Sequence, residues 1–487
     1  MTSSSSRTSS LSGSAARGSI IVLLAQAVRI AVQFASIFVL ARLLDPTDYG
    51  YLAMVMSIIG VAELLRDFGL SAAAVQSRDL SGQQQSNLFW LNAMIGLGAS
   101  LMVACASPAI AALYGEPELV PITLALAPIF FLNGISTQFR AHINRGMRFF
   151  RLSLTDVIPQ VVAFGAAITV AILTDSYVAL VVQQVSIAVV GLGLAIALSG
   201  WFPGWPKRGA SVHGHVRFGV NLLFTNLLTY GANNSQMIMV GAVWGPAQLG
   251  YFSRAYQLMA LPLTQVMAPM TKVALPVLSK VQGESKRYID IVGRAQLLGL
   301  YITAPMFLLC FAMAEPMIEL ALGDQWIAST PIFALLALGG AFRSMSQLAY
   351  WMFLSSGSTQ KQFVFNAWAL PVIVILMAAG LPWGGLGVAA GHTVGYALYL
   401  PASILVASRA AGIPWRPLTF AAARVFGFLG TGVVGVGYAS TLIPVLPVLQ
   451  ILIGIAGAGI WAFGITMATS AGRRDLRVLR AFASAAR

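Results

Sequence analysis

The sequence has few charged residues. Asp, Glu, Lys and Arg make up only 9% of its 487 residues, whereas apolar residues make up 58%. A soluble globular chain carries about 25% charged residues, so this chain has too little charge to cover its apolar surface in water. Its mean hydropathy of +0.80 agrees with that estimate. The composition therefore excludes a water-soluble globular fold and predicts a membrane protein.

Several kinds of active site are missing as well. The only cysteines, Cys105 and Cys310, lie in apolar segments, and the four histidines have no metal-binding spacing, so we expect neither disulfides nor a metal site. There is no Gly-x-x-x-x-Gly-Lys-[Ser/Thr] loop for ATP. The connections are too short for a catalytic domain and lack an acidic cluster for a nucleotide-sugar. We predict a protein that is not an enzyme and needs no cofactor beyond a coupling ion, H⁺ or Na⁺.

What the sequence has is long apolar blocks that contain Gly and Pro. A helix needs about 20 residues to cross a hydrocarbon core about 30 Å thick, and membrane helices tolerate Gly and Pro. The sequence predicts an all-α polytopic membrane protein with about fourteen transmembrane helices, near 19–41, 50–73, 88–113, 118–139, 153–174, 177–200, 216–243, 250–276, 293–315, 327–354, 361–381, 385–408, 418–442 and 446–470.

The placement of basic residues predicts the orientation of these helices. With the N-terminus in the cytoplasm, 23 of the 29 lysines and arginines fall on the inner side, and only Arg42 and Arg254 fall outside. Short inner loops are enriched in Lys and Arg, and the inner membrane face is anionic. The net charge of +14 therefore needs no nucleic acid to explain it. We expect a multi-pass protein of a bacterial cytoplasmic membrane with both termini inside.

A weak internal repeat suggests two similar halves. Residues 46–51 read Pro-Thr-Asp-Tyr-Gly-Tyr, and residues 246–251 read Pro-Ala-Gln-Leu-Gly-Tyr, in equivalent outward hairpins. Transporters are commonly built from such repeats, with the substrate site between them. We predict two pseudo-symmetric six-helix lobes around a central cavity plus two extra C-terminal helices. The segments are a disordered Ser-rich cytoplasmic tail (1–18), an N-lobe (19–200), a cytoplasmic linker (201–215), a C-lobe (216–408), helices 13 and 14 (418–470) and a basic cytoplasmic tail (471–487).

Ionisable residues inside the predicted spans are the candidate site, because they are costly at membrane depth unless paired or hydrated. The basic candidates are Arg29, Arg66, Arg343 and Lys272, and the acidic ones are Glu63 and Asp67. The arginines could bind an anionic head group, since guanidinium forms bidentate hydrogen bonds with phosphate. Glu63 and Asp67 would then order the arginines or titrate as coupling groups. The alternative is a structural ion-pair cluster, and Lys272 could instead extend to the inner interface.

The seventh predicted span is unusually polar. Its side chains recur at helical spacing at Asn226, Thr229, Asn233 and Gln236. This pattern indicates a stripe that faces water or a sugar. Hydrogen-bonded packing between helices explains the same pattern equally well, so both interpretations stay open.

Four motifs in order resemble the polysaccharide transporter family of Wzx-like flippases, which belongs to the multidrug, oligosaccharidyl-lipid and polysaccharide exporter superfamily. They are Ala-Arg-Leu-Leu-Asp-Pro-Thr-Asp-Tyr-Gly-Tyr (41–51), Asp-Phe-Gly-Leu-Ser-Ala-Ala-Ala-Val-Gln (67–76), Arg-Gly-Met-Arg-Phe (145–149) and Gly-Tyr-Phe-Ser-Arg-Ala-Tyr (250–256). The resemblance covers residues 18–410. It implies that the protein flips an undecaprenyl-diphosphate-linked oligosaccharide by alternating access, and that arginines such as Arg29, Arg66 and Arg343 bind the diphosphate.

Two other functions compete with a flippase. One is a small-molecule antiporter of the multidrug type, which would have twelve spans and acid-centred cation sites. The other is a membrane scaffold of a polysaccharide assembly complex that transports nothing. For the flippase, the expected partners are the lipid-linked oligosaccharide, membrane lipids, a polysaccharide polymerase and glycosyltransferases.

Overall fold

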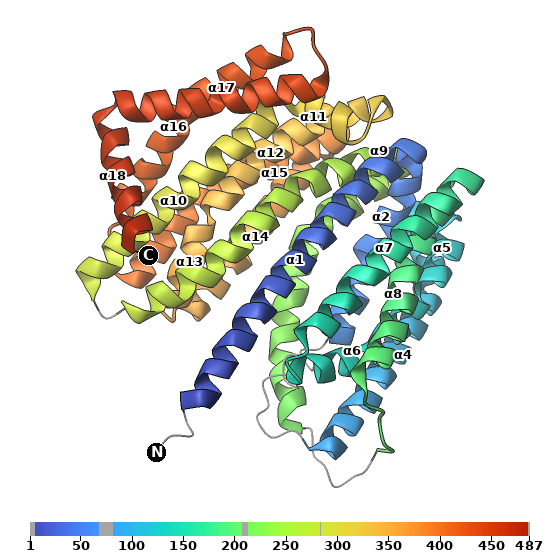
Figure 1. Cartoon of the computed structure of the whole chain (residues 1–487). Coiled ribbons are helices and arrows are strands. Elements are labelled where there is room, and N and C mark those ends of the chain that lie inside the picture. The colour runs from blue at the N-terminus through green and yellow to red at the C-terminus, as the bar shows by residue number, and fades with distance from the viewer. Residues whose placement is uncertain (1–4, 68–80, 207–212, 283, 486–487) are drawn as a thin grey trace. The chain divides into compact units, whose positions relative to one another are not determined.

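A computed structural model describes residues 5–67, 81–206, 213–282 and 284–485, and within these ranges the only regular secondary structure is helix. The all-α prediction is confirmed. The chain divides into two compact units, Met1–Gly250 and Tyr251–Arg487 (Figure 1). Helix α1 begins at Ser5, within the segment predicted as a disordered tail. The polar N-terminal stretch thus continues the first apolar helix.

The first unit contains eight of the labelled helices, the last of which continues into the second unit. α7 packs against α8 and α1, while α4 packs against α6 and α2. The bounds are α1 (Ser5–Leu43), α2 (Pro46–Asp67), α4 (Gly82–Tyr114), α5 (Leu119–Leu126), α6 (Pro128–Arg145), α7 (Phe149–Thr174), α8 (Val178–Ser199) and α9 (His213–Lys280).

The second unit begins within α9 and ends with three helices that follow one another closely. α12 packs against α10 and α15, and α16 packs against α10 and α17. The bounds are α10 (Ser285–Ala312), α11 (Ala314–Ala321), η1 (Asp324–Ser329), α12 (Thr330–Met345), α13 (Gln347–Ser355), α14 (Thr359–Gly380), η2 (Leu381–Trp383), α15 (Gly384–Ala411), α16 (Trp415–Thr441), α17 (Pro447–Ala468) and α18 (Ser470–Ala485).

Eleven segments of the described chain are long and apolar enough to cross a membrane. Two of them, Thr229–Lys280 and Thr359–Ala411, contain 52 and 53 residues. A straight helix of that length would be about 80 Å long, more than twice a hydrocarbon core. The first is kinked at Gly245, whose φ is 77°, and the second is interrupted by η2. Each of these segments therefore has a built-in break in its interior.

The two repeated turns contact each other inside the first unit. A methyl group on Gly50 would lie 1.8 Å from the carbonyl oxygen of Pro246, and a methyl group on Gly250 would lie 1.8 Å from the carbonyl oxygen of Pro46. Equivalent positions of the repeat thus make the same contact with each other. Only glycine allows backbones to approach this closely.

α2 and α9 are joined further along by a tyrosine. The Tyr230 hydroxyl lies 3.1 Å from the carbonyl oxygens of both Met56 and Ser57, to which it can donate. A side chain on Gly60 would overlap the Tyr230 ring, with 1.9 Å to its hydroxyl oxygen. These contacts hold α2 in place next to the position of Glu63.

α18 is a strongly amphipathic helix. Its basic residues Arg473, Arg474 and Arg477 are exposed, whereas Asp475 is only 4% exposed. Asp475 accepts hydrogen bonds from Arg424 on α16 at 2.6 Å and from Tyr301 on α10 at 3.0 Å. Within the segment predicted as a basic tail, the Asp475 carboxylate fastens α18 to the second unit.

Candidate functional site

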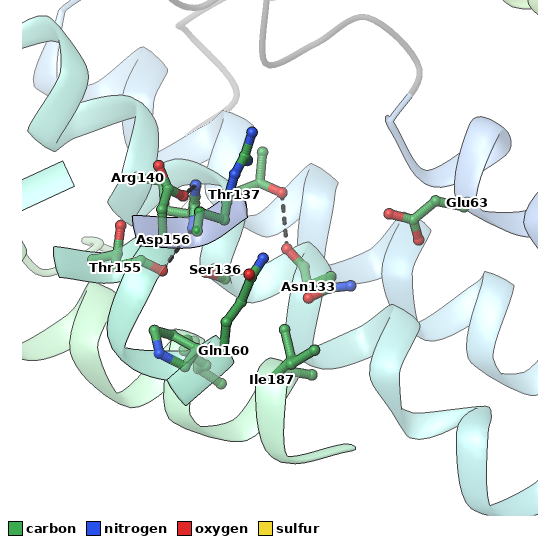
Figure 2. Close-up of a pocket in the computed structure, with 14 residues that line it drawn as sticks. Glu63, Asn133, Ser136, Thr137, Arg140, Thr155, Asp156, Gln160 and Ile187 are labelled. Carbon is green, nitrogen blue, oxygen red and sulfur yellow. Dashed lines mark hydrogen bonds and ion pairs between the residues drawn. The ribbon is translucent and has the colours of Figure 1, made fainter. Parts of the chain in front are cut away.

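A polar cavity of about 360 Å³ lies within the first unit (Figure 2). Side chains from α1, α2, α6, α7 and α8 line it. Its charged residues are Arg29, Glu63, Arg140 and Asp156. The uncharged polar ones are Asn133, Ser136, Thr137, Thr155 and Gln160. The volume falls in the range of small-molecule sites, about 300–1,000 Å³.

Helical spacing explains why these side chains meet. On α6, Asn133, Thr137 and Arg140 follow at i, i+4 and i+7, so they lie on one face. On α7, Asp156 and Gln160 are four residues apart and also share a face. The two helices come together near the loop that joins them, because Arg140 is close to the end of α6 and Asp156 is close to the start of α7.

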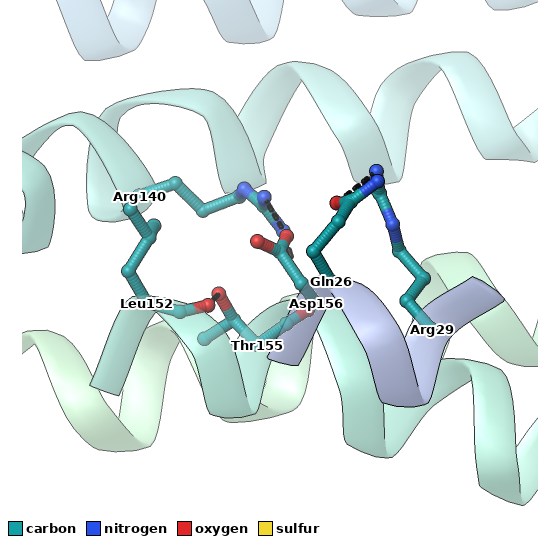
Figure 3. Close-up of polar contacts among 6 residues, drawn as sticks. All are labelled: Gln26, Arg29, Arg140, Leu152, Thr155 and Asp156. Atoms are coloured by element: carbon teal, nitrogen blue, oxygen red, sulfur yellow. Dashed lines mark hydrogen bonds and ion pairs between the residues drawn. The ribbon is translucent and has the colours of Figure 1, made fainter. Parts of the chain in front are cut away.

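An ion pair between Arg140 and Asp156 joins α6 to α7 at the cavity (Figure 3). Arg140 also donates from Nη1 to the carbonyl oxygen of Thr155 at 3.3 Å. The Thr155 hydroxyl in turn donates to the carbonyl oxygen of Leu152 at 2.7 Å. Both members of the ion pair are about one-third exposed, so they remain accessible from the cavity.

The structure brings Arg29 and Glu63 to the same cavity, although they come from different helices. The guanidinium of Arg29 donates from Nη2 to Gln26 Oε1 at 2.6 Å (Figure 3). Arg29 lies within the candidate span Ile21–Leu43, as the sequence predicts. The side chains of Arg66 and Asp67 lie outside the described residues, so their place in the cluster stays a prediction.

Most of the cavity was missed at the level of sequence. Arg140 falls directly after the predicted span 118–139, and Asn133, Thr137, Asp156 and Gln160 were not singled out. The available signal was the recurrence of polar residues at helical spacing on two consecutive spans. We recognised that pattern in the seventh span alone.

Arg343 lies in the second unit, within the candidate span Asp324–Ser355. Its Nη1 donates to the Tyr256 hydroxyl at 3.1 Å, and its Cζ lies 5.3 Å from the centre of the Tyr396 ring. His392, only 2% exposed, packs against both tyrosine rings. A cation–π contact and a phenol hydroxyl orient the guanidinium.

The other predicted site residues lie elsewhere. Lys272 is exposed on α9. Gln236 is 2% exposed, and its Nε2 donates to the carbonyl oxygen of Asn233 in its own helix at 3.1 Å. Thr229 is exposed, and the side chain of Asn226 lies outside the described residues. The described residues that line the cavity in the first unit do not include Thr229, Asn233, Gln236 or Lys272. The sugar-facing stripe stays a prediction.

The first motif of the resemblance has a structural role at the opposite end of the first unit. Asp48, at the start of α2, accepts a hydrogen bond at Oδ1 from the backbone N–H of Tyr177 at 2.9 Å. The Tyr177 hydroxyl donates to Glu118 at 3.1 Å. Burial raises the pKa of the Asp48 carboxyl, while the backbone N–H groups of Asp45 and Tyr177 act in the opposite direction. These contacts join the start of α2, the turn before α5 and the turn before α8.

The helical spans define a multi-pass membrane fold, and solved structures share this fold. The lipid II flippase MurJ, in an inward closed conformation, superposes with a TM-score of 0.72 over 91% of this chain and 98% of its own, at 15% identity. An inward-facing multidrug resistance MATE family transporter of the MOP superfamily superposes with a TM-score of 0.53 over 78% and 95%, at 13% identity. At these identities the likeness concerns the fold.

The sequence matches the polysaccharide biosynthesis protein family over residues 39–331, and the chain belongs to that family. The teichuronic acid biosynthesis protein TuaB of Bacillus subtilis is 26% identical over 67% of this chain and 68% of its own length. The lipopolysaccharide biosynthesis protein WzxC of Escherichia coli is 24% identical over 72% of each chain. The succinoglycan biosynthesis transport protein ExoT of Rhizobium meliloti is 23% identical over 63% and 62%.

Proposed function

We propose that this protein flips an undecaprenyl-diphosphate-linked oligosaccharide from the inner to the outer leaflet of the cytoplasmic membrane by alternating access. The family membership, the relatives named for polysaccharide synthesis and transport, and the fold shared with a lipid II flippase support this proposal. The substrate would come from glycosyltransferases and pass to a polymerase. A proton or sodium ion would drive the cycle.

The observation that carries the proposal is Arg343. A guanidinium within a span is expensive unless something uses its charge, and here a hydroxyl and an aromatic ring hold it. A diphosphate offers oxygens that match the planar donor fork of arginine. In this proposal Arg343 binds the diphosphate, while Arg29, Arg66 and Lys272 add positive charge along its path. Glu63 and Asp67 order those side chains.

The proposal includes fourteen spans with both termini in the cytoplasm, arranged as two six-helix lobes and an additional pair. The 52- and 53-residue segments would each cross twice, at the breaks described above, and α2 would be one further span. The cavity of the first unit then lies toward the cytoplasmic side, because Arg140 and Asp156 adjoin the basic loop between α6 and α7. That position suits loading from the inner leaflet.

The test is to replace Arg343 with alanine and with lysine. Loss of a charge-assisted hydrogen bond to phosphate costs about 1.5–3 kcal/mol, so Arg343→Ala should lower flipping about ten- to hundred-fold. Lysine keeps the charge but not the fork, so Arg343→Lys should recover part of it. The measurement is exposure of lipid-linked sugar to an added glycosidase in proteoliposomes.

The matched control is Arg409→Ala, which removes an exposed arginine near the end of α15 and should flip normally. Equal amounts of folded protein are checked by size-exclusion chromatography. Normal flipping by Arg343→Ala would remove this arginine from the mechanism. Transport of organic cations instead of lipid-linked sugar by the wild type would favour a multidrug-type antiporter.

A further inference from the structure

The cavity of the first unit contains amide and hydroxyl groups with unused hydrogen-bonding capacity. Asn133 and Ser136 on α6 and Gln160 on α7 make no side-chain hydrogen bond with the described part of the chain, yet all three line the cavity. Figure 2 shows Gln160 extending toward the α6 side chains. A carboxamide offers two donors and two acceptor sites. Facing amides of this kind can bind a ligand that both donates and accepts.

Among the described residues that line the cavity, the formal charges cancel. Two guanidiniums, Arg29 and Arg140, face two carboxylates, Glu63 and Asp156, and Arg140 is already paired with Asp156. A dianionic diphosphate would gain little from such a site, because the carboxylates repel it as strongly as the arginines attract it. An uncharged ligand rich in hydroxyl groups loses nothing by this balance.

The remaining wall is apolar. Pro159 on α7 and Ile187, Ala188, Gly191 and Leu192 on α8 are the other described residues of the lining. A sugar ring has the matching character, since its hydroxyls lie around the rim and its C–H groups form its faces. Hydrogen-bonding groups on one side and an apolar surface on the other therefore suit a ring of this kind.

We propose that this cavity binds a neutral sugar residue of the lipid-linked oligosaccharide, with Asn133 and Gln160 donating to and accepting from its hydroxyls. The inference depends on the proposed function. It assigns the glycan and the diphosphate of the substrate to different binding sites. The first unit binds the glycan here, whereas Arg343, which lies outside this cavity, binds the diphosphate. The protein would then select its substrate by the sugar as well as by the lipid diphosphate.

The test uses the full-length protein in lipid nanodiscs and three probes. One is undecaprenyl diphosphate, another is the lipid-linked oligosaccharide that accumulates in a strain lacking this protein, and the third is the free oligosaccharide released from it by mild acid. Binding to the wild type and to the Asn133→Ala/Gln160→Ala variant is compared. Gln362→Ala, on α14 and outside the cavity, is the matched control.

The double variant should bind the lipid-linked oligosaccharide about tenfold more weakly, because it loses two neutral hydrogen bonds to the glycan. Its affinity for undecaprenyl diphosphate should stay within about twofold of the wild type. Free oligosaccharide should bind weakly to the wild type and not measurably to the variant. Gln362→Ala should match the wild type with all three probes.

Two outcomes would overturn the inference while leaving the proposed function intact. One is an equal loss of affinity for undecaprenyl diphosphate, which would make the cavity a phosphate site. The other is unchanged affinity for the lipid-linked oligosaccharide. If the wild type binds neither lipid, the proposed function fails, and this inference fails with it. The single variants Asn133→Ala and Gln160→Ala replace the double variant if it does not fold.

Discussion

Replacing Asp475 with alanine should detach α18 from the second unit. The carboxylate accepts from Arg424 at 2.6 Å and from Tyr301 at 3.0 Å. The side chains of Asp475 and Arg424 are only 5% and 13% exposed. Removing one member of a buried ion pair costs about 3–5 kcal/mol, since the other charge stays buried without compensation. We expect Asp475→Ala to reach that range.

The loss of stability should depend on whether a buried charge is left without its partner. Tyr301→Phe removes one hydrogen bond to a charged group and should cost about 1.5–3 kcal/mol. Replacing both charges, as in Asp475→Leu/Arg424→Leu, leaves no buried charge and should recover much of the loss of Asp475→Ala. A double-mutant cycle between Asp475 and Arg424 then gives their coupling energy.

Two measurements in detergent check this. Thermal unfolding reports the loss of stability, and hydrogen exchange over residues 470–485 reports the release of the helix. Arg474→Ala is the control, because its side chain is exposed on the same helix. If Asp475→Ala melts like the wild type and α18 exchanges no faster, the assignment of Asp475 as the anchor of this helix is wrong.

The remaining predictions concern the paired turns and the orientation. Gly50→Ala and Gly250→Ala should each destabilise the protein severely, because each methyl group would lie 1.8 Å from a carbonyl oxygen. Gly98 has open space around it, so Gly98→Ala should be neutral or stabilise α4 by up to about 1 kcal/mol. Thermal unfolding of all three decides this, and a Gly50→Ala protein as stable as the wild type would contradict the close contact. In a chain with Cys105→Ser and Cys310→Ser, Glu116→Cys should react with an impermeant maleimide in intact cells, and Lys361→Cys only after lysis. The reverse pattern would invert the proposed orientation.

The sequence predicted those features that depend on composition and local spacing. Few charges and long apolar blocks were enough for an all-α membrane fold. Arg29 and Glu63 could also be selected, each as a single ionisable residue within a predicted span. The free-energy cost of such a residue does not depend on which helices are its neighbours. Both line the cavity.

Pairing between distant helices could not be predicted in this way. The Asp475 carboxylate binds groups 51 and 174 positions away in the chain, and its basic neighbours dominate the local pattern. The segment was therefore predicted as a tail. For the same reason, Arg140 was not selected. Nothing in its local sequence indicates that its side chain reaches Asp156 across the turn between α6 and α7.

The reciprocal contact of Gly50 with Pro246 and of Gly250 with Pro46 limits how this protein can change over time. When two side chains collide, a second substitution can shorten one of them and restore the fit. Here the obstacle is a carbonyl oxygen, which every amino acid carries. No substitution at the opposite turn could make room, so we expect that random mutagenesis under selection for function will return no second-site suppressors for either glycine among side-chain replacements at 46 or 246.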